Sequence, residues 1–502
     1  MGSISFNDIP ATIRLPAVLV EIDNSKAVGG STLMPYTNLV VGQRLATGTV
    51  AAATPIRVTT TAQAKAYFGA GSLLALMCET QLKNNEITET WAVALADDAA
   101  SAKAAGAMTF SGDVTASGTL FLYVAGQRLK IGVAAGQDAA ATAAAVVAAI
   151  ATAKDLPVTA AVDGAVAGKV NLTARNAGET GNVIDVRVNY YDGEALPAGL
   201  AIAWGNGGGT VDGSPTPPWL WAAATAGQVS YSANIDPARP FKTLALTGVL
   251  APKTSPGMRL AGGTANPDIG DVFAAIGDKH CNVLTVPWID AANLHALHVE
   301  LLDRWTGLRM IEGMAFVGAY GTMSAIGTLG DSLNSPFISI ADATGGRTFA
   351  ESNLLLFDGV SVYSTDADGT VRIWQIITTY KTTASGAEDI SYLKVNTILT
   401  LGYLRYDWRN LVLREFPRHK LANDGVKYKP TQAIVTPKIL RARAATWLME
   451  KAEDALVENV DAAIAAMVVE RNDDNPDRAD MYLPPDIVNQ FDILATQLGF
   501  RL

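Results

Sequence analysis

The sequence predicts an α/β core, with a small α+β domain inserted into it and an extended arm at each end. Short apolar stretches alternate with helical stretches between residues 25 and 98, which is the pattern of a sheet covered by helices. The composition becomes rich in Ala, Gly, Val and Thr from residue 99, and prolines set off apolar runs near both ends. At 502 residues the chain is longer than one core can use, so we expect two to four domains.

The N-terminal arm, together with the first strand, is expected over residues 1–24. Pro10 and Pro16 interrupt any continuous helix, and residues 17–22 place apolar side chains on one face, as a strand does. A strand without a partner in its own core invites pairing with another chain. The apolar residues expected to make this contact are Phe6, Ile9, Ile13, Leu15, Val18, Val20 and Ile22.

The first part of the core is expected over residues 25–98. A short buried strand at 39–42 precedes two helices at 61–68 and 72–84, and a further strand follows at 91–95.

The inserted α+β domain is expected over residues 99–196. Gly126 and Gln127 form a short turn between two strand-like runs, and Asp138 caps a helix that runs to about residue 154. Because the insert enters and leaves at adjacent points, we expect it to fold alone and to lie on the outer surface of an assembly. Its strands are expected at 119–125, 128–133, 158–162, 169–174 and 183–190.

A linker rich in Gly and Pro is expected at 197–218, because that composition does not build the interior of helices or strands. The second part of the core follows at 219–485, and between residues 312 and 340 we expect two short strands separated by a Gly-rich loop. Its other early elements are expected as helices at 219–229, 268–278 and 291–305 and as strands at 240–250 and 281–286.

Residues 354–421 are predicted to form the scaffold of this second part. Strands at 360–365 and 370–379 flank an Asp-Gly turn, and the second of them is apolar on both faces, which predicts cover on both sides. Apolar residues at helical spacing predict a long helix over 389–415, which Pro417 ends.

The chain closes with another helix and a second arm. The pair Thr436-Pro437 is a typical helix start, and this helix is expected to run to about residue 456. The pair Pro484-Pro485 stiffens the approach to the C-terminal arm at 486–502. The apolar residues of this arm expected to contact another chain are Ile487, Val488, Phe491, Ile493, Leu494, Leu498 and Phe500.

Composition and charge exclude several classes of protein. Hydrophobic residues make up 49% of the chain and charged residues only 17%, so much surface is expected to be buried in large domains or against other subunits. The net charge of −10 argues against a nucleic-acid partner. The N-terminus has no signal-peptide pattern, and the longest apolar tract, Ala139–Ala153, is too short to span a bilayer, so we expect no membrane insertion.

The usual motifs of hydrolases, phosphate-binding loops and metal sites do not occur in the sequence. Cys78 and Cys281 lie in no metal or redox spacing and are expected to be buried thiols. Asp366 and Asp368 resemble the start of a calcium loop, but the glutamate that such a loop needs at its twelfth position does not follow. We therefore expect no catalytic residue, no cofactor and no metal.

One pair of histidines has a spacing that can share a helix face. His295 and His298 lie three positions apart on an expected helix, and a metal there would need a third ligand, for which Asp290 and Glu300 are candidates only by proximity. A packed or solvated helix face is the expected role of this pair.

Several long stretches carry a recognisable pattern. They are ISFNDIPATIRLPAVLVEIDNSKA, GTLFLYVAGQRLKIGVAAG, SPTPPWLWAAA, DPARPFKTLAL, AGGTANPDI, FPRHKLANDG, QAIVTPKILRA, VVERN and LPPDIVNQFDILATQLGFRL. Together they resemble the contractile tail sheath proteins of Mu-like bacteriophages, which belong to the myovirus tail sheath family. The resemblance covers nearly the whole chain, and the last third is its most specific part.

The resemblance implies a structural subunit and not an enzyme. It implies a core of subtilisin-like topology without a protease site, and a helical homopolymer of stacked rings around the tail tube protein. Baseplate and tail terminator proteins are the further partners that it implies, and contraction of the sheath drives the tube through the host cell envelope. The implied location is the virion tail, made and assembled in the host bacterial cytoplasm.

Three alternatives stay open at this point. The chain has the sequence features expected of the sheath of a related contractile injection particle, such as a tailocin. A virion adhesin that binds sugars would use the small β-rich insert, and a hydrolase would need a catalytic site that the sequence does not display.

Basic residues concentrate between Arg405 and Lys451. Eleven basic residues and four acidic ones give this stretch a net charge of +7, whereas the rest of the chain carries −17. One interpretation is solvated helix faces and local ion pairs, each contributing roughly 0–1 kcal/mol. The other is that Lys438, Arg441 and Arg443 face an acidic tube, with the acidic stretch 453–492 of a neighbour as a competing target.

Overall fold

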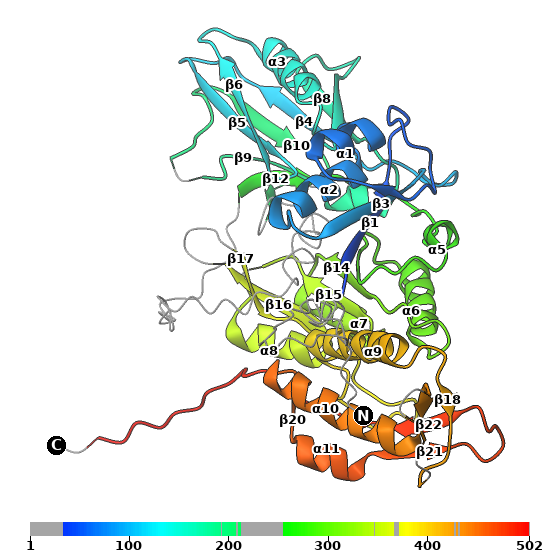
Figure 1. Ribbon diagram of the computed structural model, residues 1–502. Coiled ribbons are helices and arrows are strands. Elements are labelled where there is room, and N and C mark those ends of the chain that lie inside the picture. The colour runs from blue at the N-terminus through cyan, green and yellow to red at the C-terminus, as the bar shows by residue number, and fades with distance from the viewer. Residues whose placement is uncertain are drawn as a thin grey trace, which may run out of the picture. The chain divides into compact units, whose positions relative to one another are not determined.

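The computed structural model describes residues 34–191, 193–206, 209–211, 255–345, 347–365, 371–425, 428–429 and 432–500 (Figure 1). The chain divides into two compact units, one of residues 36–399 and one of residues 1–35 with 400–502. The expected N-terminal arm with its seven apolar residues, the elements expected at 219–229 and 240–250, and the turn with Asp366 and Asp368 lie outside the described residues.

The unit of residues 36–399 is built on an eight-stranded sheet with the order β17-β16-β15-β14-β13-β1-β3-β2. The six inner strands pair in parallel, and the two edge strands pair antiparallel to their neighbours. The strands are β1 (Thr37–Gln43), β2 (Ile56–Arg57), β3 (Glu89–Leu95), β13 (Val283–Thr285), β14 (Met314–Ala319), β15 (Ile338–Asp342), β16 (Val360–Thr365) and β17 (Val371–Gln375). A parallel sheet with connecting helices is an α/β architecture, as the sequence predicts.

Helices cover both faces of this sheet. Alternate residues of β1 point to opposite faces, so their contacts show which helices lie on each face. Val40 packs in one apolar cluster with α1 and α2, whereas Leu39 and Val41 pack in another with α5, α6, α7 and α8. The helices are α1 (Thr61–Phe68), α2 (Leu73–Asn84), α5 (Gly270–Ile276), α6 (Ala291–Trp305), α7 (Met323–Asp331) and α8 (Phe349–Phe357). The helices expected at 61–68, 72–84 and 291–305 are confirmed.

The Gly-rich loop expected between residues 312 and 340 is wrong, because helix α7 connects β14 to β15. Thr322 caps this helix through the backbone N–H of Ala325. A Cβ atom on Gly330 would lie 2.4 Å from the carbonyl oxygen of Asp358, and one on Gly327 would meet the Asp358 carboxylate at the same distance. These glycines therefore permit close packing against α8, and they do not mark a loop.

Two further expectations for the scaffold need correction. The hairpin of β16 and β17 is confirmed, but Trp374 of β17 is 38% exposed, because this strand forms an edge of the sheet and is not covered on both sides. The long helix α9 (Val395–Glu415) begins six residues later than expected. The preceding residues form a turn in which the Tyr380 hydroxyl donates to Asp389 at 2.6 Å.

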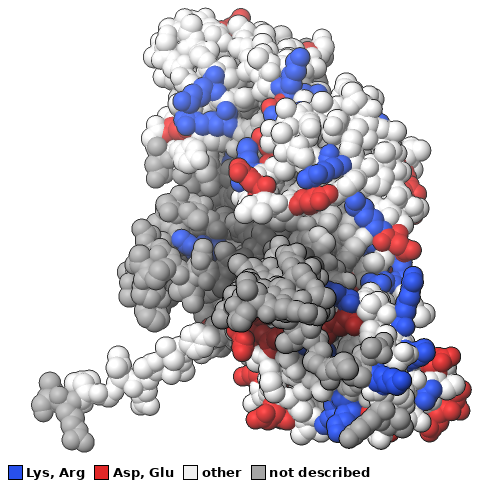
Figure 2. All heavy atoms as spheres, viewed as in Figure 1, with Lys and Arg blue, Asp and Glu red and all other residues white. Residues whose placement is uncertain are grey.

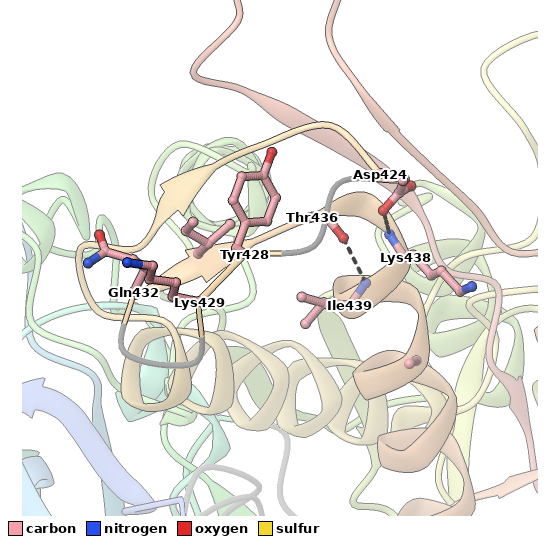
Figure 3. Close-up of a pocket in the computed structure, with 10 residues that line it drawn as sticks. Asp424, Tyr428, Lys429, Gln432, Thr436, Lys438 and Ile439 are labelled. Atoms are coloured by element: carbon pink, nitrogen blue, oxygen red, sulfur yellow. Dashed lines mark hydrogen bonds between the residues drawn. The ribbon is translucent and has the colours of Figure 1, made fainter. Parts of the chain in front are cut away.

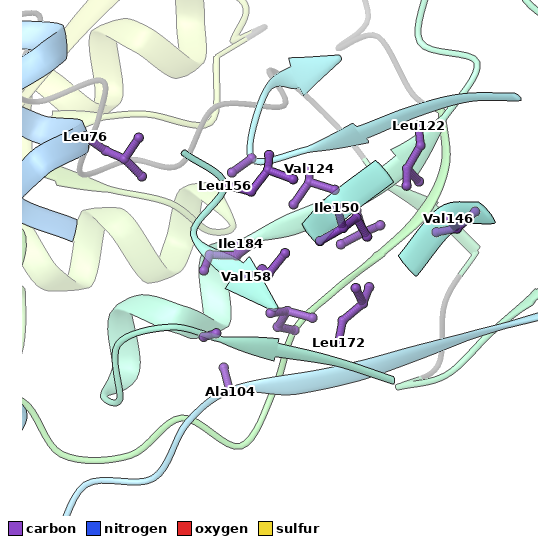
Figure 4. Packing of buried hydrophobic residues seen from close by; sticks show 14 of the residues in the cluster. Leu76, Ala104, Leu122, Val124, Val146, Ile150, Leu156, Val158, Leu172 and Ile184 are labelled. Carbon is purple, nitrogen blue, oxygen red and sulfur yellow. The ribbon is translucent and has the colours of Figure 1, made fainter. Parts of the chain in front are cut away.

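Between β3 and β13 the chain forms two separate antiparallel sheets with the orders β10-β4-β8-β7 and β11-β12-β9-β5-β6. Helix α3 (Ala139–Thr152), capped by Asp138 as expected, packs Val146 and Ile150 among apolar residues of these strands (Figure 4). The strands are β4 (Ala105–Ser111), β5 (Gly118–Val124), β6 (Gln127–Val133), β7 (Val158–Val162), β8 (Lys169–Ala174), β9 (Asp185–Val188), β10 (Ala201–Trp204), β11 (Gly209–Val211) and β12 (Ser255–Arg259); a 3₁₀ helix spans Glu179–Val183.

The linker expected at 197–218 is therefore wrong in part. Strand β10 pairs with β4 and β11 pairs with β12, so residues on both sides of the Gly-rich stretch belong to these sheets. Strand β12 also pairs with β9, which extends this part of the fold well beyond residue 196.

The C-terminal unit contains most of α9 and two further helices, α10 (Pro437–Glu453) and α11 (Val460–Ala466). Thr436 caps α10 and Pro437 occupies its first turn, as expected. Among its described residues, short strands pair as β18 (Lys420–Leu421) with β19 (Ile434–Val435), β20 (Val457–Glu458) with β23 (Asp486–Ile487), and β21 (Val468–Arg471) with β22 (Ala479–Tyr482). The apolar core of the unit is Leu404, Leu411, Ala444, Trp447, Leu448, Val457, Ala463 and Met467.

Candidate functional site

The C-terminal tail is an extended segment whose apolar side chains are exposed. No helix or strand forms in the described tail after Ile487. The exposed fraction is 80% for Phe491, 83% for Ile493, 68% for Leu494, 91% for Leu498 and 84% for Phe500. Each apolar side chain of this size gains roughly 1.5–3 kcal/mol when it is buried. Burial against another chain would supply that free energy.

The start of the tail differs from the expected arm. Asp486 and Ile487 pair with β20 of their own unit, and the N–H of Val488 donates to the carbonyl oxygen of Leu456 at 3.2 Å. Ile487 therefore pairs within its own subunit, where it lies on the edge of β20. The exposed apolar segment begins after Val488.

The hairpin of β21 and β22 is a second feature of the C-terminal unit. It is a two-stranded sheet in the described residues, so both of its outer edges lack a neighbouring strand. Val468 and Tyr482, which pair across it, are 51% and 63% exposed. A two-stranded sheet is marginally stable by itself and gains stability from added strands.

Two of the three basic residues singled out on α10 are occupied within their own unit. Arg441 donates to the carbonyl oxygens of Ile464, at 2.7 Å, and of Met467, and so satisfies the C-terminal end of α11. Arg443 donates to Glu415 at 2.8 Å and to Glu450 at 3.2 Å. Its pKa is raised, because these carboxylates outweigh the lowering effect of burial.

Lys438 and Lys451 lie in opposite environments. The Lys438 side chain is exposed, and its backbone N–H donates to Asp424 at 3.2 Å. Lys451 is only 2% exposed and lies 3.4 Å from Asp407 and 2.7 Å from Asp454. Burial lowers the pKa of this ammonium group, but the carboxylates outweigh burial and raise it. Local ion pairs thus account for several charges of the basic stretch.

A pocket of about 540 Å³ opens at the N-terminal end of α10 (Figure 3). Its basic residues are Lys429 and Lys438, and its acidic residue is Asp424. The remaining wall combines apolar and polar side chains, among them Tyr428, Gln432, Ile434, Thr436, Ile439 and Ala442. In the lower part of Figure 2, basic and acidic side chains gather in separate groups.

Of the histidine pair, His295 is exposed and His298 is partly buried. His298 Nδ1 lies 2.9 Å from the hydroxyl of Ser335, and burial lowers the pKa of this imidazole. Both cysteines are buried free thiols. Across the described residues, no group of three or more His, Cys, Asp or Glu side chains is arranged to hold a metal ion. None of the helices described is both long and apolar enough to cross a bilayer.

Comparison with known proteins gives a full-length relative. Residues 387–501 match the family model described as phage tail sheath C-terminal domain. The chain is 32% identical, over 542 aligned positions that cover all of both sequences, to the Mu-like prophage FluMu tail sheath protein of Haemophilus influenzae.

Two solved structures are also similar. One is a sheath tail protein from Desulfitobacterium hafniense, with 11% identity, a TM-score of 0.42, and coverage of 94% of this chain and 97% of that one. The other is a sheath tail protein from Listeria innocua, with 13% identity, a TM-score of 0.41, and coverage of 91% and 92%.

Proposed function

The chain belongs to the phage tail sheath family, and from this membership we propose that it polymerises around a tail tube and contracts to drive that tube through a host cell envelope. The observation that carries the proposal within the structure is the exposed apolar tail after Val488. Such a tail gives each subunit a means to bind the next one. The source of mechanical work would be the free-energy difference between two packings of the same subunits.

We infer that the tail adds a strand to the β21–β22 hairpin of a neighbouring subunit. The open edges of that hairpin supply unpaired backbone groups, and main-chain hydrogen bonds give such strand addition its affinity. The N-terminal arm is proposed to add to the same acceptor. The further partners in this proposal are baseplate and tail terminator proteins, with assembly in the host cytoplasm and without enzymatic activity.

Negative-stain microscopy of the purified full chain tests the proposed function directly. Tubes or stacked rings are expected. A monodisperse preparation at every concentration and salt condition would contradict the proposal.

The two sheets between β3 and β13 are proposed to be an inserted domain on the outside of the sheath, on a core of subtilisin-like topology. Because β10 and β12 supply neighbours to β4 and β9, a fragment of residues 99–196 is expected to fail to fold, whereas residues 99–264 fold cooperatively. Circular dichroism and thermal melting of both fragments check this. Cooperative melting of the shorter fragment would show that β10 and β12 are dispensable.

Tube contact is proposed for the exposed face of α10, with Lys438 as its basic residue. Replacing Lys438 by Glu should reduce cosedimentation with tubes, most strongly at low salt, because hydrated surface contacts are screened. Arg441 and Arg443 are unsuitable for this test, since their replacement breaks contacts inside the unit.

The matched control is Lys103→Glu, which makes the same charge change at an exposed lysine outside the C-terminal unit. Equal cosedimentation of the two variants at low salt would refute the assignment of Lys438.

A further inference from the structure

We propose that the pocket at the N-terminal end of α10 receives an acidic loop from a second copy of the chain. The acidic loop consists of residues 472–478, which connect β21 to β22. The proposal rests on the polymer proposed above, and it adds a specific electrostatic contact between subunits.

The pocket offers space and positive charge to such a loop. Its volume is about 540 Å³, and it is open to the surface. The side chains of Lys429 and Lys438 are exposed and make no ion pair within the described residues. Tyr428 and Ile439 are 40% and 42% exposed and offer apolar contact beside these charges.

The acidic side chain of the pocket does not cancel its positive character. Asp424 accepts a hydrogen bond from the backbone N–H of Lys438 at 3.2 Å, at the first turn of α10 (Figure 3). This carboxylate is therefore directed at the positive end of the helix. The two ammonium groups lie on flexible side chains and can reach a second set of carboxylates.

The acidic loop carries three exposed carboxylates, on Asp473, Asp474 and Asp477, none of which forms an ion pair among the residues that the structure describes. Hydrogen bonds within the loop fix its backbone conformation. Asn472 Oδ1 accepts hydrogen bonds from the N–H groups of Asp474, at 3.0 Å, and of Asn475, at 2.8 Å. A loop ordered before binding loses less conformational entropy when it docks.

The position of the loop within its own unit favours a second copy as the partner. Arg471, at the base of the loop, donates to Asn423 at 3.0 Å, beside the edge of the pocket. The loop carboxylates nevertheless pair with neither Lys429 nor Lys438 of the same chain. The loop and the pocket are different surfaces, and a contact between different surfaces of identical subunits repeats as a ring or a helix.

This contact would share Lys438 with the proposed tube contact. One ammonium group cannot serve both partners fully, so docking of the loop weakens the hold on the tube. Exchange of partners at Lys438 would thereby couple subunit packing to release of the tube.

Charge reversal and charge exchange in the full chain test the inference. The pocket variant is Lys429→Glu with Lys438→Glu, the loop variant is Asp473→Lys with Asp474→Lys, and a third variant combines the four changes. The control is Lys103→Glu with Lys130→Glu, two exposed lysines far from both surfaces in sequence. The critical concentration for assembly is measured by sedimentation at about 0.1 M and about 1 M salt, between which the Debye length falls from about 10 to about 3 Å.

The pocket variant and the loop variant are each expected to raise the critical concentration about tenfold or more at the lower salt, which corresponds to about 1.4 kcal/mol. The combined variant should return close to the wild-type value, and the control should not change it. The inference is overturned if either the pocket variant or the loop variant leaves the critical concentration unchanged. It is also overturned if both of these variants fold but the combined variant does not recover the wild-type value.

Two other outcomes distinguish a failure of this inference from a failure of the proposed function on which it rests. If the wild-type chain forms no polymer, the proposed function itself fails. If the pocket variant assembles normally and loses only its cosedimentation with tubes, the pocket belongs to the tube and the loop assignment is wrong. Circular dichroism of each variant verifies that it is folded.

Discussion

Deletion of residues 489–502 should leave a folded, soluble subunit that forms no tubes. The deletion removes Phe491, Ile493, Leu494, Leu498 and Phe500, whose exposed fractions range from 68% to 91%, and with them the apolar area proposed to be buried between subunits. It retains β23 and the hydrogen bond of Val488, so the C-terminal unit keeps its own pairing. Sedimentation and negative-stain microscopy provide the measurement.

The placement of this deletion matters. A cut at residue 486 would also remove β23 and the hydrogen bond that Asn459 donates to Asp486 at 2.7 Å, so loss of assembly could reflect damage to the fold. The matched control is Ile87→Ser with Leu308→Ser, which removes apolar side chains that are 98% and 94% exposed outside the tail. Tubes formed by the tail-deleted chain, or lost equally in this control, would contradict the role assigned to the tail.

Replacement of Asp407 by Ala should destabilise the C-terminal unit by about 3–5 kcal/mol, the usual cost of breaking a buried ion pair by removing one partner. Asp407 accepts a hydrogen bond from the indole N–H of Trp447 at 2.8 Å and lies 3.4 Å from the buried ammonium of Lys451. Its loss leaves the indole N–H without this acceptor, and of the two carboxylates that lie near Lys451 in the described residues, Asp454 remains.

Hydrogen exchange of α10 measures this effect locally, which is needed because a chain of two units is not expected to unfold in one step. Asp407→Asn keeps an acceptor for the indole and should be less damaging. The surface control, Asp461→Ala, should change stability by no more than about 0.5 kcal/mol. Similar exchange rates for the Asp407→Ala and Asp461→Ala variants would show that the buried pair contributes nothing.

Signals between neighbouring residues were enough to locate many elements from the sequence. Thr436 and Pro437 start α10, Asp138 starts α3, and the chain after Glu415 leaves the helix before Pro417. A cap or a proline acts on backbone groups within a few residues, so its effect does not depend on the rest of the fold. The apolar tail could likewise be recognised, because its pattern has no counterpart to pack against nearby in the sequence.

The tertiary structure alone decided which charges are free and which strands pair. Arg441 and Arg443 lie in the same basic stretch as Lys438, but their partners at Ile464, Glu415 and Glu450 are brought close only by the packing of α9, α10 and α11. Lys451 is buried for the same reason.

The pairing of strands also depends on residues that are distant in the sequence. Strand β12 pairs with β9, about 70 residues earlier in the chain, so composition read along the sequence did not show that residues beyond 196 belong to the same sheet. The glycines of α7 are a further example, since a Cβ atom on Gly330 would meet the carbonyl oxygen of Asp358, a residue of another segment. Sequence by itself determined the helix starts at Asp138 and Thr436 and the apolar character of the C-terminal tail. The partners of its charges and strand edges depend on contacts between distant residues, which no local pattern records.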